Sequence, residues 1–295
     1  MSEILNEPVA GPVTLATTPR TPFSWARLRG RVPLVIGIVL VVLIVLSAVF
    51  APLLAPYDPN EQDLVNALAP PGTAGHLLGT DQFGRDLLSR VLFAGRVDLL
   101  IAFAATCVTM TFGSFYGLVS GFSGRRVDAV LMRIVDVVFA FPLIVLVLAV
   151  IAILGSGLLN MLIAMWAVTW VPYARIVRGE VLVLKQRDYT VAARALGYGN
   201  ARIMFRHVLP NAAAPALVYG MVDAVNNVSI GAALGFLGLG VADPTAEWGK
   251  MIADAQEYIA TNWWLAAVPG VMIALFGLGL SLIGDNLADW LRGER

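Results

Sequence analysis

Cysteine, histidine and charged residues are all scarce in this sequence. Among its 295 residues there are one cysteine and two histidines, and 14% of the residues are charged. The single cysteine, Cys107, excludes an intrachain disulfide and a cysteine-based metal cage, and its place inside an apolar run favours a packing role. His76 and His207 have no carboxylate neighbours at zinc-ligand spacing, so no metal site is predicted. Basic and acidic residues both number 20, so the net charge gives no indication of a nucleic-acid partner.

Motifs for nucleotide or acyl chemistry are also missing. Met251 follows the only Gly-Lys pair, Gly249-Lys250, and Pro244 stands where a phosphate-binding loop has its first glycine. Ser156 lies in Gly-Ser-Gly and lacks the Gly-x-Ser-x-Gly frame of a serine hydrolase. The chain is therefore expected to be non-catalytic and to hold no cofactor and no metal ion of its own.

Apolar residues, in contrast, are in excess. They make up 58% of the chain, and the mean hydropathy is +0.79, whereas soluble domains are about half apolar and about a quarter charged. The excess comes in separated runs long enough to cross about 30 Å of hydrocarbon. We predict an all-α polytopic membrane protein with six transmembrane helices, at residues 33–54, 98–120, 134–154, 158–176, 213–240 and 264–284.

Three regions follow from this pattern. Residues 1–32 are polar and contain four prolines, which predicts a cytoplasmic tail, and the run after them is too long for a signal-peptide core. Residues 33–96 hold the first span and an extracytoplasmic or interfacial segment, in which Gln82–Gly95 is expected to lie along the interface. Residues 97–292 form the core membrane domain, with five spans and a polar loop at 177–212. Within it, Pro142 is expected to kink the third span.

The distribution of basic residues predicts the orientation. With six spans, one face holds sixteen basic residues: Arg20, Arg27, Arg29, Arg31, Arg125, Arg126, Arg133, Arg175, Arg178, Lys185, Arg187, Arg194, Arg202, Arg206, Arg292 and Arg295. The other face holds only Arg85, Arg90, Arg96 and Lys250. Basic residues are retained in the cytoplasm, so both termini and the 177–212 loop should be cytoplasmic. Four aromatic residues are then expected at the outer interface: Trp248, Tyr258, Trp263 and Trp264.

The 177–212 loop has the pattern of two short helices. Residues 187–197 contain good helix formers, an acidic residue near the start and a glycine at the end. A second piece, at residues 201–209, is expected to stop at Pro210. Two short helices between membrane spans would form a compact lever, and the alternative is a solvated loop.

This loop resembles the EAA loop of ABC-importer permeases. The residues that carry the resemblance are Ala192, Ala193, Gly197, Leu209 and Pro210. Val191 stands where the motif usually has glutamate, and His207 where it often has isoleucine. The first departure removes a polar contact to the ATPase.

Further matches, between about residues 33 and 292, are similar to the C-type permease subunits of the dipeptide, oligopeptide and nickel importer family. They are Leu78-Gly79-Thr80-Asp81 with Gly84-Arg85-Asp86 and Ser89-Arg90, then Arg206-His207-Val208-Leu209-Pro210-Asn211, Gly235-Phe236-Leu237-Gly238-Leu239-Gly240, Pro244 with Glu247-Trp248-Gly249, and Gly284-Asp285. The resemblance implies the fold of an ABC type I importer in a bacterial plasma (inner) membrane.

The resemblance also implies partners and a coupling site. The partners are a second homologous permease, two ABC ATPase subunits or domains that bind ATP and Mg, and an extracytoplasmic solute-binding protein. The residues expected to couple to the ATPases through the 188–199 segment are Asp188, Tyr189, Ala192, Ala193, Arg194, Gly197, Tyr198 and Pro210. Dipeptides, oligopeptides, glutathione, nickel chelates and haem all remain open as substrates.

Three polar residues inside the fifth predicted span are candidates for the translocation path. Asp223, Asn226 and Asn227 are spaced three and four residues apart, which predicts one helical face. Polar groups are costly in lipid, so this face should point to the bundle interior or to a water-filled cavity. Interhelical hydrogen bonding without a transport role is the alternative.

Other classes of membrane protein are weighed against the importer. A secondary transporter usually shows inverted repeats and paired broken helices, and neither is clear here. A channel needs a filter, and the glycine-rich 231–240 run superficially suggests one. Glycines at this spacing, such as Gly231 and Gly235, more often allow close helix packing. A membrane enzyme lacks convergent titratable groups in this sequence. Co-purification with an ATPase would separate an importer from all three.

Overall fold

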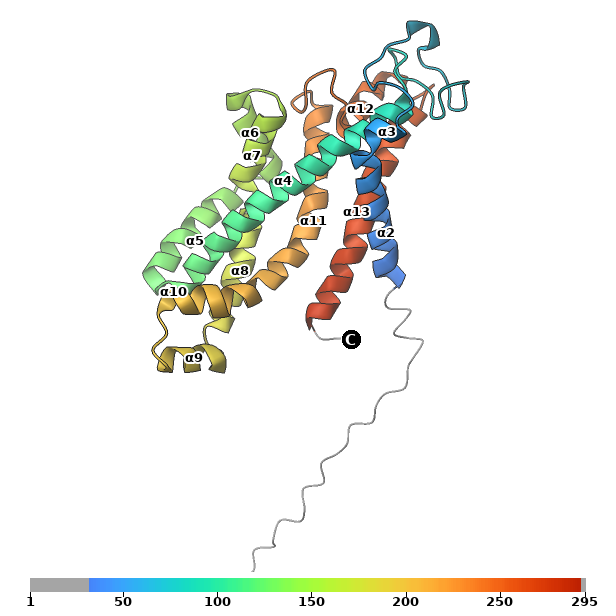
Figure 1. Cartoon of the computed structure of the whole chain (residues 1–295). Helices are drawn as coiled ribbons and strands as arrows, with labels where there is room; N and C mark the ends of the chain where they lie inside the picture. Colours follow the sequence, from blue (N-terminus) through green and yellow to red (C-terminus); the bar gives the residue numbers. More distant parts are fainter. Residues whose placement is uncertain (1–31, 293–295) are drawn as a thin grey trace, which may run out of the picture.

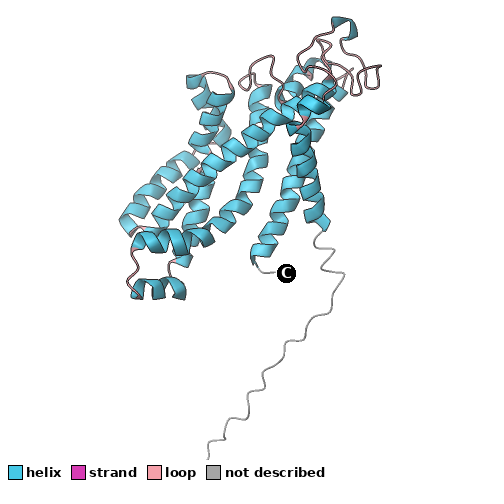
Figure 2. Cartoon of the chain, viewed as in Figure 1, coloured by secondary structure: helices cyan, strands magenta, loops and turns pink. Residues whose placement is uncertain are grey.

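Residues 32–292 are described in the structure, which is a computed structural model. This part of the chain is built from helices and loops, and it contains no β-strand, as Figures 1 and 2 show. The all-α prediction is therefore confirmed. The tail predicted at residues 1–32 lies, except for its last residue, outside the described residues.

Four helices are long and apolar enough to cross a membrane. They are Val32–Val49 (α2), Leu87–Phe122 (α4), the continuous stretch Asn200–Phe236, and Trp264–Leu291, which belongs to α13 (Trp264–Arg292). A fifth candidate is the pair Arg125–Phe139 (α5) and Leu143–Leu154 (α6), which meet at a bend of 84°. The remaining predicted span, at 158–176, is divided between Leu158–Val168 (α7) and Val171–Leu184 (α8). Six membrane crossings remain a prediction.

The bend between α5 and α6 lies where Pro142 was expected to kink the third span. Pro142 is the residue before α6, and residues 140–142 separate the two helices. Proline cannot continue the hydrogen-bond ladder of the preceding helix, which explains the break. Gly155 and Gly157, with φ angles of +85° and +126°, then make the turn into α7.

The helix of the second span is longer than predicted. Residues 87–95 are its first turns, because α4 runs without a break from Leu87 to Phe122. The Asp86 carboxylate starts this helix by accepting the Ser89 N–H at 2.8 Å. The polar side chains of its first turns are buried, and Arg90 is 1% exposed. The amphipathic pattern there therefore coincides with burial of both polar and apolar side chains inside the protein.

The 55–86 segment follows the short helix Ala51–Leu54 (α3), contains the short helix Leu64–Asn66 (η1) and folds onto the start of α4. Arg85 donates to Asp81 at 2.6 Å, and Arg90 lies 3.4 Å from the same carboxylate. His76 lies 3.0 Å from Asp86. These buried pairs tie the segment down and give His76 a structural role.

Trp248 corrects a second prediction, since it is a core residue and not an interfacial anchor. Its side chain is fully buried, and its indole N–H donates to the Val91 carbonyl at 3.1 Å. It begins the short helix Trp248–Asp254 (α12), which Glu247 caps by accepting the Gly249 and Lys250 N–H groups. Burial raises the pKa of Glu247. Cys107, expected to be packed, is exposed on α4.

The helices give the protein two distinct ends (Figure 1). At one end lie the start of α2, the end of α13 and the short helix Asp188–Ala195 (α9); we call this the α9 end. At the other, the α12 end, lie α12, the 55–86 segment and the turn between α6 and α7. Helix α4 crosses the molecule between the two ends and packs on α8 and on Leu209–Phe236 (α11).

Candidate functional site

Helix α9 projects from the α9 end between α8 and the stretch that leads to α11 (Figure 1). It begins at Asp188 and ends at Ala195, as the helix-former pattern predicts. Gly197 follows with a φ of +81°, and its N–H donates to the Arg194 carbonyl while the Tyr198 N–H donates to Ala193. A left-handed residue that closes a helix in this way is normally glycine, because a side chain would be strained there.

One side of α9 holds it to the protein, and the other is open. Ala193 and Thr190 are buried, and the Thr190 hydroxyl donates to the Leu184 carbonyl at 2.8 Å. The remaining coupling candidates are all exposed: Asp188, Tyr189, Ala192, Arg194, Gly197, Tyr198 and Pro210. Val191 and Leu196 are exposed as well, Leu196 by 75%. The outer side of α9 thus offers apolar and charged groups together, as protein-binding surfaces do.

Pro210 does not stop the helix, which corrects the prediction for residues 201–209. Helix Asn200–Ile203 (α10) continues through a π-helical turn at Met204–Val208 (η2) directly into α11. Proline in a helix removes a hydrogen bond and its ring crowds the preceding turn. The wider π turn ends at Val208, two residues before Pro210, and gives that ring room, so one helical rod leads from the 177–212 loop into α11.

One ion pair and two further hydrogen bonds join the helices near α9. The Arg178 guanidinium donates to both carboxylate oxygens of Asp128, at 2.6 and 2.7 Å, and Ser120 donates to the same group at 2.6 Å. Lys185 donates to the Gly121 carbonyl at 2.8 Å. Helices α4, α5 and α8 are therefore joined beneath the coupling loop.

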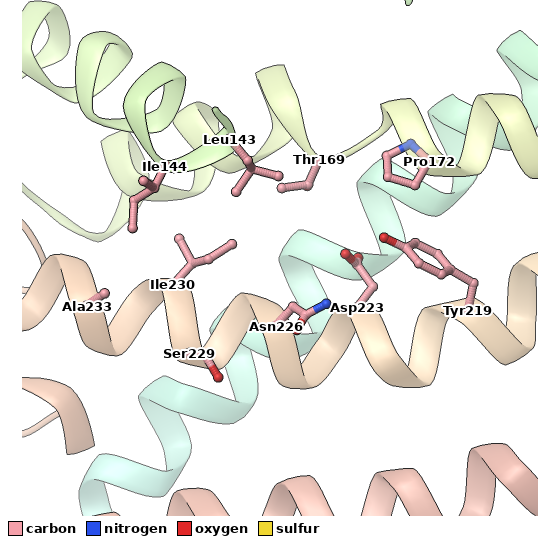
Figure 3. Close-up of a pocket in the computed structure, with 10 residues that line it drawn as sticks. All are labelled: Leu143, Ile144, Thr169, Pro172, Tyr219, Asp223, Asn226, Ser229, Ile230 and Ala233. Carbon is pink, nitrogen blue, oxygen red and sulfur yellow. The ribbon is translucent and has the colours of Figure 1, made fainter. Parts of the chain in front are cut away.

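A cavity of about 400 Å³ lies farther along α11 (Figure 3). Six of its lining residues come from α11, and the other four come from the start of α6 and from the junction of α7 and α8. They are Tyr219, Asp223, Asn226, Ser229, Ile230 and Ala233, then Leu143, Ile144, Thr169 and Pro172. The walls are mostly apolar, and the polar groups gather on α11.

Asp223 is held between three helices. Its Oδ2 atom accepts the Tyr173 hydroxyl at 2.9 Å and the Asn227 side-chain amide at 3.0 Å. The Asn227 amide also donates to the Thr106 hydroxyl of α4 at 3.0 Å. Tyr173 packs edge-on against Tyr219, with ring centroids 4.9 Å apart. The carboxylate therefore has a fixed position, with one oxygen engaged twice.

The three predicted path residues divide into two environments. Asp223 and Asn227 are buried, whereas Asn226 is exposed, and Asp223 and Asn226 line the cavity. Asn227 donates to Thr106 of α4 and to Asp223 within α11, which are contacts of the kind that interhelical packing would give. Tyr219 also lines the cavity but was not predicted from the sequence, although it precedes Asp223 by one helical turn. Tyr173 and Thr106 have no such local signal.

The comparisons with known proteins bear on the whole chain. The family of binding-protein-dependent transport system inner membrane components matches residues 113–293, and the N-terminal TM domain of oligopeptide transport permease C matches residues 22–71. This chain belongs to the binding-protein-dependent transport family. It is thus a multi-pass inner-membrane protein of an ABC importer.

Individual relatives extend the match to almost every residue. The chain is 41% identical to a di/tripeptide transport system permease protein of Pseudomonas aeruginosa, over 99% of this chain and 97% of the relative. It is 38% identical to a probable D,D-dipeptide transport system permease protein of Escherichia coli, over 92% of each chain. An oligopeptide transport system permease protein of Bacillus subtilis is 36% identical over 90% of this chain and 87% of its own length.

Proposed function

We propose that this chain is a permease subunit of an ATP-driven importer for di- or oligopeptides. The observation that carries the proposal is the match, over nearly the full length, to relatives named as peptide permeases. No feature of residues 32–292 favours a secondary transporter or a channel over this function.

The chain works in a complex under this proposal. Its sequence has no phosphate-binding loop, so two ABC ATPase subunits or domains supply ATP and Mg binding. A second homologous permease completes the path, and an extracytoplasmic solute-binding protein delivers the peptide. The exposed side of α9 suits docking to an ATPase because it is apolar in part and is the outermost helix of the α9 end (Figure 1).

The orientation follows from the positive residues. The coupling loop and the starts and ends of the helices around it carry most of the basic residues, and the α12 end carries four. Because basic residues are retained in the cytoplasm, we infer that the α9 end and both termini are cytoplasmic and that the α12 end lies outside. Peptide would enter from the α12 end.

The mechanism rests on the two helices that leave the coupling loop. Closure of the ATPase pair on ATP would displace α9, and α8 and the α10–α11 rod would carry that displacement to the cavity. A ligand-driven shift between two packed arrangements of the helices would open the cavity to one side of the membrane and close it to the other. ATP binding is in this way converted into access from alternate sides.

The test compares two substitutions of an exposed apolar residue by aspartate, one at each end of the protein. Leu196→Asp places a charge on the exposed apolar surface beside α9, and Val65→Asp does the same on the 93%-exposed Val65 of the α12 end. Each variant is co-expressed with the second permease, the ATPases and the binding protein. Leu196→Asp should lose co-purifying ATPase at least tenfold, since burying an unpaired charge at an interface costs more than about 1.4 kcal/mol. Val65→Asp should retain the ATPase.

Transport is measured with the same complexes in proteoliposomes. The wild-type complex should take up labelled dipeptide only with ATP, and the purified chain alone should hydrolyse no ATP. Uptake that needs an ion gradient instead of ATP would overturn the importer. Equal ATPase retention by both variants would overturn docking at α9.

A further inference from the structure

The cavity beside α11 contains one carboxylate and no basic side chain. Asp223 is its sole carboxylic acid, and none of the ten lining residues is lysine or arginine. The side chains that hydrogen-bond to Asp223 are all neutral: the Tyr173 hydroxyl, the Asn227 amide and the Thr106 hydroxyl. Within residues 32–292, no ion pair involves this carboxylate.

This arrangement leaves Asp223 with spare bonding capacity. A carboxylate has two oxygens and about four acceptor positions, and Asp223 has three neutral partners, of which Tyr173 and Asn227 share Oδ2. The residue is 3% exposed and lines the cavity, where Figure 3 shows its carboxylate lying between the two walls. A buried charge without a cation is costly, so a cationic group that enters the cavity would gain a strong, charge-assisted hydrogen bond.

The surroundings select what kind of cation can enter. The facing wall is apolar, with Leu143, Ile144 and Pro172, which suits a solute that has an apolar body. Asn226 is exposed one helical turn from Asp223 and can both donate to and accept from an amide. A solute carboxylate would be repelled by Asp223, because like charges in a site of low dielectric are costly.

We propose that Asp223 is a transient binding site for the α-ammonium group of the peptide in transit, with Asn226 contacting the first peptide bond. The inference rests on the proposed function, which names peptides but assigns no recognition to this chain. Under this proposal the permease itself selects peptides with a free amino terminus, after the binding protein has released the solute.

The first test compares alanyl-alanine with its N-formyl derivative, which has nearly the same size and no ammonium group. Uptake into proteoliposomes is measured for the full complex, with the binding protein saturated by each peptide. The wild type should transport the free peptide about tenfold or more faster, as a charge-assisted hydrogen bond allows. Asp223→Asn keeps the acceptor for Tyr173 and should lose this preference by slowing the free peptide alone. Asp223→Glu should restore the preference.

Val222→Ala is the matched control, because Val222 is the neighbouring residue on α11 and lies exposed outside the cavity. It should transport both peptides as the wild type does. An unchanged preference in Asp223→Asn, or equal loss of both peptides, would overturn the inference and leave Asp223 a packing residue. Absence of ATP-dependent uptake by the wild type would instead refute the proposed function.

A second measurement needs no variant and no binding protein. Dicyclohexylcarbodiimide labels buried carboxyl groups, and mass spectrometry reads the label at Asp223 in the wild-type complex. Millimolar alanyl-alanine should protect Asp223 from labelling, and the N-formyl derivative should not. Equal protection by the two peptides, or protection by neither, would contradict ammonium binding at this residue.

Discussion

Replacing Gly113 by alanine should drive α4 and α8 apart. Gly113 lies on α4 where the helix crosses α8, and a Cβ atom there would lie 2.7 Å from the Tyr173 Cβ and closer still to the Trp170 carbonyl oxygen. Carbon atoms in contact are normally about 3.5–4.0 Å apart, so the helices would have to separate by roughly 1 Å. Both obstructing atoms are fixed to the backbone, and no side-chain rotation relieves the contact.

The Gly113→Ala substitution has both an unfavourable and a favourable effect on the folding free energy. Overpacking costs about 1–3 kcal/mol, and a backbone contact belongs at the upper end. Alanine in a helix interior is about 1 kcal/mol more favourable than glycine. The net loss of folding free energy should therefore be about 2 kcal/mol.

Gly179 provides the control, because the change is chemically identical and the space is open. It lies inside α8, and no atom comes within 4 Å of a Cβ built there. Gly179→Ala should stabilise the chain by about 1 kcal/mol, which places the two variants about 3 kcal/mol apart.

The assay is reversible unfolding of the purified chain from mild detergent by increasing dodecyl sulfate, followed by circular dichroism. Both variants are compared with the wild type at the same lipid-to-detergent ratio. A Gly113→Ala variant as stable as Gly179→Ala would refute the close packing of α4 on α8.

Two further predictions concern the coupling loop and the cavity. Gly197→Val should reduce ATP-dependent transport and leave membrane insertion intact, because the φ of +81° at this position strains a branched residue by about 1 kcal/mol or more. Gly199→Val is the control and should transport normally, since Gly199 has a φ of −66° and lies in equally open space. Equal transport by the two variants would contradict the left-handed turn at Gly197. In a Cys107→Ala background, a cysteine at position 226 should react with a small water-soluble thiol reagent and one at 227 should stay protected; the reverse order would place the path elsewhere.

The coupling loop was predictable because its signals are local. Helix formers from Asp188 to Ala195 and the glycine at 197 specify the helix and its end within one short segment. The turn at Gly155 and Gly157 and the bend at Pro142 were found for the same reason. At these positions glycine and proline act on their own backbone, and no distant contact is needed to predict the turn or the bend.

Errors arose where the environment decides the outcome. The sequence predicts a helix stop at Pro210, but the π turn at residues 204–208 makes room for the proline ring and the helix continues. No sequence pattern predicts that turn. Tryptophan is a residue type typical of membrane interfaces, yet the small residues Gly95 and Ala48 leave room for the Trp248 ring inside the core. The Tyr173–Asp223 pair joins residues far apart in the sequence, so only the packing of α8 on α11 reveals it.

The same Tyr173–Asp223 contact gives the proposed coupling a physical route. Helix α8 carries Tyr173 near its start and leads to α9 at its end, and the continuous α10–α11 rod returns from α9 to Asp223. At 1.5 Å of rise per residue, Asp223 lies about 35 Å along this rod from Asn200. A push on α9 acts on both helices, and any sliding between them must first stretch the 2.9 Å bond from Tyr173 to Asp223. A longer bond would leave Oδ2 with an acceptor position to fill, so the affinity of the cavity for an ammonium group would change with the position of α9.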